Sequence, residues 1–242
     1  MKNILDIKNL SYSFGNNPIL KDINIHVNEN EMVAIVGSSG VGKSTLFNLI
    51  AGVLKKQAGK ITINGSEDYI GKVAYMLQKD LLFEHKTIID NVILPLIIAK
   101  IDKKEALEEG NKILKQFNLD KYANKYPQQL SGGMRQRVAL IRTYMFKKNI
   151  FLLDEAFSAL DAITKKELHK WYLDLKKEFN LTTLLITHDI EEAVFLSDRI
   201  YILGNKPGEI IGEIKIEINP NEDIDVQRLF YKKEILNIMN IE

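Results

Sequence analysis

A glycine-rich segment between a buried strand and a helix constrains this chain more than any other feature. The run Met32–Val36 is continuously apolar, as expected of a strand that is buried on both faces of a sheet. It is followed by Gly37–Ser44, which reads Gly-Ser-Ser-Gly-Val-Gly-Lys-Ser, and then by an apolar helical segment, Thr45–Leu54. Glycines allow consecutive backbone N–H groups to surround an anion, and the helix N-terminus adds partial positive charge. The pattern GxxxxGK[ST] between a strand and a helix therefore predicts a phosphate-binding loop.

The residues of this loop have distinct expected contacts with a bound nucleotide. Lys43 places a positive charge beside the β- and γ-phosphates, and the hydroxyl of Ser44 is suited to bind Mg²⁺. The backbone N–H groups of the other positions surround the phosphates. We expect nucleotide contacts from Gly37, Ser38, Ser39, Gly40, Val41, Gly42, Lys43, Ser44 and Thr45.

Other apolar runs extend the same sheet. Ile150–Leu153 and Thr183–Thr187 are short and continuous, and Arg199–Leu203 is a weaker example. Between the first two lies Asp161–Phe179, a charged segment whose apolar residues recur about every 3.6 positions, as in a helix. Buried strands that are joined by helices predict a parallel sheet with helices on its faces.

The beginning and the middle of the chain follow different patterns. Leu5–Leu10 and Ile23–Val27 alternate apolar and polar residues, which predicts half-exposed antiparallel strands. From Lys79 to Lys148 the pattern is helical instead. The expected helices there are Thr87–Ala99, Lys103–Phe117 and Ser131–Phe146. The chain is thus predicted to be an α/β protein with an antiparallel β subdomain and a helical insertion.

Two adjacent carboxylates, Asp154 and Glu155, directly follow the buried run Ile150–Leu153. Ligands of open α/β sheets lie beyond the carboxyl ends of the strands, and successive strand residues face opposite ways. We expect Asp154 to bind Mg²⁺, and Glu155 to orient or deprotonate the attacking water. His188 ends the next buried strand, so we expect it to contact the γ-phosphate or to hold that water.

A second glycine-rich helix start occurs at Leu130–Arg137, which reads Leu-Ser-Gly-Gly-Met-Arg-Gln-Arg. Ser131 is a good helix cap, and a cap is one complete explanation of the segment. Like the first loop, however, this helix start has free N–H groups, the positive end of a helix dipole and a hydroxyl, which together can bind an anion. Anion binding is therefore the second explanation.

With these residues the chain resembles the ATP-binding cassette (ABC) family of ATPases. The motifs that carry the resemblance are, in order, Gly37–Ser44, Gln78, Leu130–Arg137, Phe151–Glu155, Ser158–Asp161 and His188. The resemblance covers about residues 1–215 and implies a P-loop NTPase core with a mainly parallel sheet. Residues 1–78 and 149–218 would form the RecA-like core and β subdomain, and 79–148 the helical subdomain. The final residues, 219–242, are expected to form a short helical extension.

The resemblance also implies an active site shared between two subunits. In this family, Ser131, Gly132 and Gly133 of one subunit would close over the γ-phosphate that is held by its partner. The other residues expected to act across the dimer are Gln136 and Asp161. Gln78 resembles the glutamine that couples Mg²⁺ and water to the helical insertion. Phe14 matches the aromatic residue that stacks on adenine, with Tyr12 as the alternative.

One departure from the family pattern makes a local prediction. Asn30 stands where the family usually has glycine, before the acidic Glu31. Asparagine tolerates the left-handed backbone conformation better than most residues. We therefore expect Asn30 to adopt that conformation. A second departure, Ala156 in place of proline after the two carboxylates, leaves both acids intact.

Composition excludes several other classes of function. Lys and Arg total 33 against 32 Asp and Glu, so no overall positive charge draws the chain to nucleic acid. The chain has no cysteine and its four histidines are scattered, which argues against thiol chemistry and a zinc site. The longest apolar run, Val92–Ala99, falls short of the roughly 20 residues of a membrane helix, and Asp6 and Lys8 argue against a signal peptide.

Within the family, the chain is most similar to the ATPase subunits of importers. Tyr126–Leu130, Ile190–Asp198 and Lys206–Ile210 are similar to cassettes of nitrate, sulfonate, taurine and thiamine-precursor importers, and Gln78–Phe83 before Thr87–Leu96 fits their coupling region. The resemblance implies a homodimer, integral membrane permease subunits and an extracytoplasmic substrate-binding protein as partners, with no nucleic acid. The expected location is peripheral, at the cytoplasmic face of the cell membrane.

Three alternatives stay open. An exporter ATPase would carry the same motifs. A soluble cassette acting on translation or DNA usually has two cassettes in one chain or long coiled coils, which this sequence lacks. If the chain were a metabolic P-loop kinase or GTPase, the motifs Leu130–Arg137 and Ser158–Asp161 would have no known function.

Overall fold

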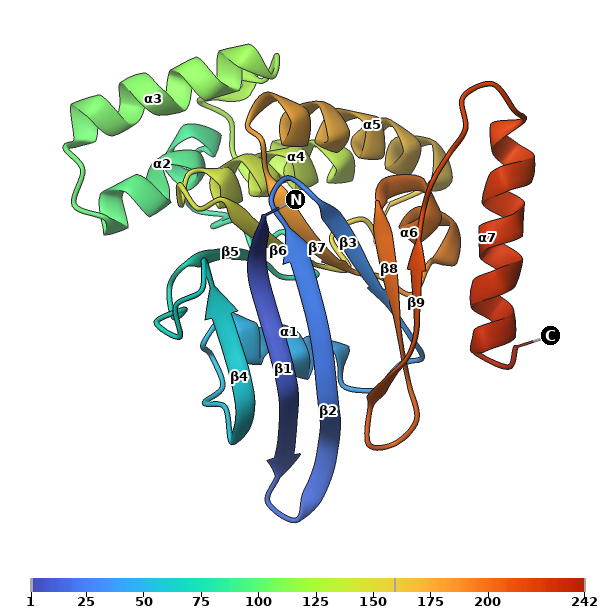
Figure 1. Ribbon diagram of the computed structural model, residues 1–242. Coiled ribbons are helices and arrows are strands. Elements are labelled where there is room, and N and C mark those ends of the chain that lie inside the picture. The colour runs from blue at the N-terminus through green and yellow to red at the C-terminus, as the bar shows by residue number, and fades with distance from the viewer. Residues whose placement is uncertain (1, 159, 242) are drawn as a thin grey trace.

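The computed structural model describes residues 2–158 and 160–241. Met1, Glu242 and Ala159, which is part of the predicted motif Ser158–Asp161, lie outside the described residues. Within the described chain the strands form two sheets, which Figure 1 shows with the helices around them. The strands are β1 (Asn3–Phe14), β2 (Asn17–Asn28), β3 (Met32–Val36), β4 (Ala58–Ile63), β5 (Val73–Met76), β6 (Ile150–Asp154), β7 (Thr182–Ile186), β8 (Arg199–Gly204) and β9 (Glu209–Lys215).

The larger sheet has the order β5-β6-β7-β3-β8-β9. Neighbouring strands from β5 to β8 run parallel, and β9 pairs with β8 in the antiparallel direction. Every residue of β3, β6 and β7 is buried, as their continuous apolar sequences predicted. Because β6, β7 and β3 are adjacent and parallel, the residues that follow them lie at one edge of the sheet.

The smaller sheet has the order β2-β1-β4 and is antiparallel throughout. Its apolar side chains pack with α1 (Lys43–Ile50) against one face of the larger sheet. The prediction of antiparallel strands near the N-terminus is therefore confirmed. The strands β4 and β9 were not predicted, because β4 contains Gly59 and Lys60 and β9 is an edge strand with few buried residues.

The other helices lie on the opposite side of the larger sheet. They are α2 (Ile88–Ile98), α3 (Lys103–Gln116), α4 (Gly132–Tyr144), α5 (Ala162–Glu178), α6 (Ile190–Leu196) and α7 (Ile224–Ile238), with short 3-10 turns at Asp120–Tyr122 and Pro127–Gln129. Of these, α4 to α7 pack with the strands of the sheet, while α2 packs on α4 and α3 packs on α2. The predicted helices at the middle of the chain are all present, and Thr87 and Ser131 cap α2 and α4. The α/β fold class with a helical insertion is confirmed, while the subdomain boundaries stay predictions.

Several predicted boundaries differ from the structure by a few residues. Thr45–Leu54 was expected to be a helix, but α1 begins at Lys43 and ends at Ile50. The reason is Gly52, whose φ of 75° takes the chain out of the helix. Strand β7 spans Thr182–Ile186, one residue earlier at each end than the predicted run Thr183–Thr187. Asn30 does adopt the left-handed conformation, with φ 63°.

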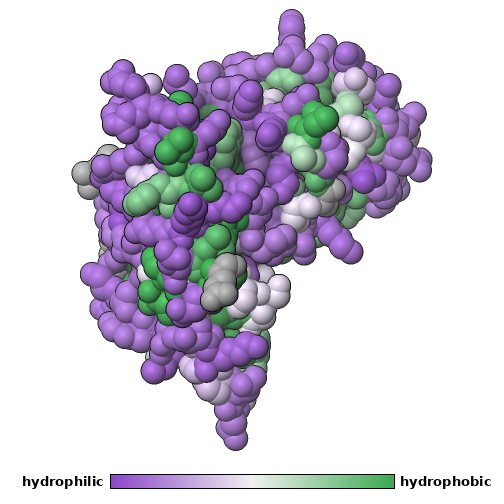
Figure 2. Space-filling view, turned by 90° about the vertical axis from the view of Figure 1, so that its right-hand side faces the viewer, coloured by the Kyte–Doolittle hydropathy of each residue, from purple (hydrophilic) through white to green (hydrophobic). Residues whose placement is uncertain are grey.

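The helix α7 covers a small third core beside α6 and β9, at the right of Figure 1. Among the described residues of α7, Ile235 alone is fully buried. Val226 and Phe230 are each 63% exposed on the outside of the helix, and Figure 2 shows hydrophobic side chains on this side of the molecule. None of the helices in the described part of the chain combines the length and the apolar character that crossing a membrane requires.

Replacing Ile235 with alanine should detach α7 from the rest of the fold. We expect the free energy of opening of α7 to fall by about 2–5 kcal/mol. The reason is that Ile235 is the fully buried side chain by which α7 packs against the rest of the fold. Hydrogen exchange of the α7 amides measures this change. The matched control, Val226→Ala, removes an exposed side chain and should shift the same amides by less than about 0.5 kcal/mol. Equal effects of the two variants would contradict this account of α7.

Candidate functional site

The predicted phosphate loop lies between β3 and α1, at the carboxyl edge of the larger sheet. Its backbone turns through left-handed conformations at Gly40 (φ 77°) and Gly42 (φ 110°), which residues with a side chain rarely adopt. Gly42 is the N-cap of α1 and no side chain caps this helix start. The first N–H groups of α1 are therefore directed to the loop, where they can bind an anion.

Lys43 lies inside this loop. Its side chain is buried, and its Nζ donates hydrogen bonds to the carbonyl oxygens of Gly37 (2.7 Å) and Ser38 (2.9 Å). Burial lowers the pKa of the Lys43 ammonium, and the nearby carboxylates of Glu155 and Asp154 oppose this effect. The loop thus holds a partly desolvated cation close to two carboxylates, where a phosphate would gain more from it than at an exposed site.

Asp154 ends β6 and is buried beside the same loop. Its Oδ2 accepts a hydrogen bond from the Tyr75 hydroxyl at 3.2 Å, and the Ser44 hydroxyl is near enough to influence its pKa. Burial raises the pKa of Asp154, while the hydroxyls of Ser44 and Tyr75 oppose the change. The pKa of the Tyr75 hydroxyl is raised too, first by its burial and then by the charge of Asp154. Tyr75 was not predicted, since a tyrosine within a strand looks like any other core residue.

The donor set of Ser44 and Asp154 fits Mg²⁺. A hydroxyl and a carboxylate that lie near each other offer two hard oxygen ligands, which this ion prefers. In the described part of the chain, no group of three or more His, Asp or Glu residues is arranged to hold a metal. The remaining oxygen ligands would then come from the expected Gln78, a nucleotide and water.

Glu155 joins two other predicted residues. Its Oε2 accepts a hydrogen bond from Gln78 Nε2 at 3.0 Å, and the same oxygen lies 3.3 Å from His188 Nδ1. Gln78 and His188, which follow β5 and β7, therefore both reach one carboxylate oxygen of Glu155, which follows β6. Glu155 has a left-handed backbone, with φ 48°, and its N–H donates to Ile186 O at 2.9 Å. Such a conformation in a residue with a long side chain costs about 1–3 kcal/mol and is typical of functional sites.

The second glycine-rich helix start lies apart from this cluster. Ser131 and Gly132 are exposed, and Ser131 Oγ accepts a weak bond from Met134 N at 3.4 Å. Gly133 is buried where α4 approaches α5, since a Cβ at this position would lie 2.4 Å from Thr164 Cγ2. No hydrogen bond connects these residues with the phosphate loop within the described residues. The two predicted anion sites of this chain thus do not meet within one molecule.

Two residues that were expected to act across the dimer are engaged inside their own chain. Gln136 is buried, and its Nε2 donates to Ala156 O at 2.7 Å, so its side chain is engaged in the interior of its own chain. The carboxylate of Asp161 caps α5 by accepting bonds from Ile163 N and Thr164 N, each at 3.1 Å. Its bonds with Thr164 are the main reason that the pKa of Asp161 is lowered, and its side chain stays exposed.

The structure separates the two aromatic candidates for stacking on a base. Phe14 is 52% exposed, whereas Tyr12 is buried and its ring meets that of Phe14 edge to face at 5.0 Å. Phe14 is therefore the accessible ring, and Tyr12 supports it. This geometry agrees with the preference for Phe14 over Tyr12 in the sequence prediction.

Two arginines of α4 hold the segment after Gln78, a contact that the sequence did not reveal. Arg142 donates to the carbonyl oxygens of Leu81 (2.8 Å) and Asp80 (2.5 Å), and Arg135 Nε lies 3.2 Å from Asp80 Oδ2. Burial lowers the pKa of Arg142, with the charge of Asp80 opposing it. The one available signal was the spacing of the two arginines, which are seven positions apart and so share a helix face. The partner segment could not be read from that spacing.

Comparison with known proteins gave consistent matches. A family model described as "ABC transporter" matches residues 20–158. The chain is 38% identical to the formylaminopyrimidine import ATP-binding protein ThiZ of Halalkalibacterium halodurans, covering 97% of this chain and 96% of that protein. It is also 41% identical to the sulfate/thiosulfate import ATP-binding protein CysA of Synechocystis. That match covers 85% of this chain but only 59% of the longer CysA protein.

Two solved structures are also similar. CbiO1 of Clostridium perfringens, described as part of the ABC transporter complex cbiONQ, superposes with a TM-score of 0.82 at 25% identity, over 99% of this chain and 95% of that one. The ATP-binding cassette MJ0796, solved as a dimer in a post-hydrolysis state with ADP and phosphate, gives a TM-score of 0.74 at 32% identity. That match covers 89% of this chain and 100% of the other.

The buried carboxylate of Asp154 should lower the stability of the ligand-free protein at neutral pH. Its pKa is raised in the folded state, so its unfavourable contribution is present above that pKa and disappears as the pH falls. Asp154→Asn should therefore raise the free energy of unfolding in urea at pH 7, and the gain should shrink toward pH 4. The control, Asp161→Asn, changes an exposed aspartate whose pKa is lowered, so it should give no gain. A loss of stability in Asp154→Asn at pH 7 would show that the buried charge is not a net cost to the fold.

Proposed function

Because the chain belongs to the ABC transporter family of ATP-binding proteins, we propose that it is the ATP-hydrolysing subunit of a membrane importer and works as a head-to-tail dimer. The observation that carries the proposal is the meeting of Gln78, Glu155 and His188 at one carboxylate oxygen, beside Lys43 and Asp154. The family match supports ATP hydrolysis, and the roles of the individual site residues are proposals.

We assign the binding of ATP to the phosphate loop and to Phe14. The N–H groups of the loop and the Lys43 ammonium bind the phosphates, and the exposed ring of Phe14 stacks on adenine. On binding, Lys43 exchanges its bonds to Gly37 O and Ser38 O for phosphate oxygens. A bound Mg²⁺ would be held by Ser44, Asp154 and Gln78 and would neutralise phosphate charge.

Glu155 is the proposed general base. Its carboxylate orients the attacking water and accepts its proton as the water oxygen bonds to the γ-phosphorus and the bond to the β-phosphate oxygen breaks. His188, 3.3 Å from Glu155 Oε2, contacts the γ-phosphate or the same water. The products are ADP and phosphate.

The site requires a second subunit for completion. Ser131 and Gly132 are exposed at the start of α4 and have no bond to the phosphate loop of their own chain within the described residues. We propose that they close over the γ-phosphate held by a partner, with Gly133 behind them. The dimeric post-hydrolysis structure of a 32% identical cassette supports this arrangement. For Gln136 and Asp161, which are engaged within their own chain, we propose positioning roles at the two helix starts instead of direct contact with the partner's nucleotide.

Import is favoured by the relatives. ThiZ and CysA are both described as import ATP-binding proteins, for formylaminopyrimidine and for sulfate or thiosulfate respectively. The segment after β5 exposes Leu77, Leu81 and Phe83, each at least 43%, beside the helical insertion. We propose that integral membrane permease subunits dock there, that a substrate-binding protein acts through the permease, and that the chain lies at the cytoplasmic face of the membrane. An exporter ATPase is the second candidate.

Glu155→Gln should separate ATP binding from hydrolysis. Glutamine has the same shape but does not accept the proton, so turnover should fall by a factor of about 10² or more while nucleotide binding is kept. The variant should accumulate an ATP-dependent dimer, detected by size-exclusion chromatography with light scattering. The control Glu108→Gln changes an exposed glutamate on α3 and should behave as wild type. A monomer that hydrolyses ATP at the full rate would contradict the two-subunit site.

The importer assignment predicts co-purification from native membranes. Mild detergent extraction with a tagged chain should recover an integral membrane subunit, identified by mass spectrometry. Phe83→Asp places a charge in the exposed apolar segment and should reduce recovery of that subunit while the ATPase rate of the isolated protein is kept. Recovery of ribosomes or DNA in place of a membrane subunit would contradict the assignment.

A further inference from the structure

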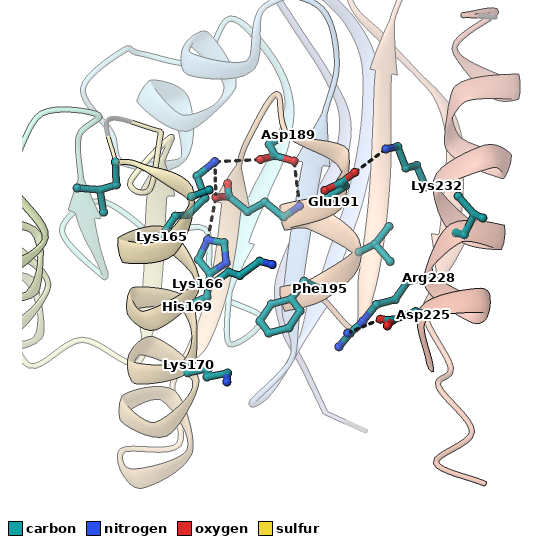
Figure 3. Close-up of a pocket in the computed structure, with 15 residues that line it drawn as sticks. Lys165, Lys166, His169, Lys170, Asp189, Glu191, Phe195, Asp225, Arg228 and Lys232 are labelled. Carbon is teal, nitrogen blue, oxygen red and sulfur yellow. Dashed lines mark hydrogen bonds and ion pairs between the residues drawn. The ribbon is translucent and has the colours of Figure 1, made fainter. Parts of the chain in front are cut away.

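The two helices that follow the catalytic segments touch each other at their first turns. α5 begins directly after Asp161, and α6 begins directly after His188 with Asp189 as its N-cap. Both helices, together with α7, line a cavity of about 760 Å³. Figure 3 shows Lys165 of α5 pointing across this cavity toward Asp189 at the start of α6.

Lys165 pairs with two carboxylates of α6. Its Nζ lies 2.9 Å from Asp189 Oδ2 and 3.8 Å from Glu192 Oε1. The other oxygen of Asp189 accepts the N–H of Glu192 at 3.1 Å, which caps α6. One carboxylate therefore fastens its own helix start and also joins it to α5.

Hydrogen bonds hold the backbone on both sides of His188. Asp189 N donates to the hydroxyl of the buried Thr187 at 3.0 Å, and Thr187 N donates to Ile35 O of β3. On one side His188 is thus fixed to the central sheet. On the other side it is followed by Asp189, whose carboxylate pairs with Lys165.

The ion pair is more protected than an ordinary surface pair. The side chain of Lys165 is 21% exposed, that of Asp189 33% and that of Glu192 only 2%. Burial opposes both charges, but the pKa of Asp189 is lowered by its bonds from Lys165 and Glu192 N. The pKa of Lys165 is raised by its hydrogen bond to Asp189 and by the charges of Glu192 and Asp189. Both groups are charged over the whole physiological pH range, so their pairing is a constant constraint.

Glu192, which lies 3.8 Å from Lys165, also connects α6 with the segment after Glu155. Glu192 Oε1 lies 2.9 Å from His169 Nε2, a buried pair between α6 and α5. The ring of His169 meets that of Phe157 edge to face at 4.9 Å, and Phe157 lies two residues after Glu155. At the other end, Lys165 N donates to Asp161 O, so Lys165 belongs to the turn that Asp161 caps.

We propose that Lys165 is a positioning residue for hydrolysis: its pairing with Asp189 holds His188 within reach of Glu155 and couples His188 to the Asp161 segment. This inference rests on the proposed roles of Glu155 and His188. A movement of Asp161 on dimer formation would be transmitted through the first turn of α5 to the start of α6. Lys165 itself contacts neither nucleotide nor water.

The test compares Lys165→Met with Lys166→Met. The neighbouring Lys166 is exposed and forms no ion pair within the described residues, so it controls for the loss of a lysine on the same helix turn. We expect Lys165→Met to lower kcat about tenfold and to leave KM for ATP within about twofold, because the chemistry is affected and binding is not. Lys166→Met should keep wild-type values, and Lys165→Arg, which keeps the charge, should recover at least half of kcat.

Asp189→Asn supplies a second and independent variant. Asparagine still caps a helix but has no charge for Lys165, so kcat should fall to a similar extent. The double variant with Lys165→Met should be no slower than the slower single variant, since both remove one interaction. If Lys165→Met does not fold, Asp189→Asn and Lys165→Arg still test the proposal.

Three results would overturn the positioning role. They are an unchanged kcat in Lys165→Met, a multiplicative loss in the double variant, and an equal loss in Lys165→Met and Lys165→Arg. Failure of the proposed function gives a different result, since Glu155→Gln would then hydrolyse ATP at the wild-type rate whatever the Lys165 variants do. The two hypotheses are therefore separable in one series of ATPase measurements.

Discussion

The site exists because three fully buried strands, β6, β7 and β3, run parallel and side by side. Their ladders place the residues that follow them at one edge, so Asp154, Glu155, His188 and the phosphate loop converge although they are up to about 150 positions apart in the chain. Apart from Asp154 at the end of β6 and the threonines of β7, the residues of these three strands are apolar. At this edge Gln78 and His188 both lie within reach of the same carboxylate oxygen of Glu155.

The cost of the site is local. Lys43 and Asp154 are buried charged groups, and burial disfavours the charged form of each. Glu155 adds an unfavourable backbone conformation. These features are tolerated because Lys43, Asp154 and Glu155 lie close enough to interact, and because Tyr75 donates a hydrogen bond to Asp154. In the proposed function, a site arranged in this way exchanges stability in the ligand-free state for complementarity to a bound phosphate.

Sequence patterns predicted the parts of this protein that depend on local order. The continuous runs of β3, β6 and β7 marked buried strands, and Ser131, Thr87 and Asp161 marked helix starts. The weakly patterned strands β4 and β9 were missed, because their stability comes from pairing with β1 and β8 and not from their own residues. Among the site residues, Tyr75, Arg142 and Lys165 could not be identified from sequence, since each acts through a partner at least 24 positions away.

The sequence by itself determined the chemistry of this protein: a glycine-rich loop with Lys43 and Ser44, two carboxylates after a buried strand, and a second glycine-rich helix start. These features depend on residue type and short spacing, which a linear pattern records completely. Only the tertiary structure decided which of them meet. It placed Gln78 and His188 at Glu155, turned Gln136 into the interior, and joined α5 to α6 through Lys165. Such contacts depend on the order and direction of strands and on the packing of helices, and no local spacing encodes them.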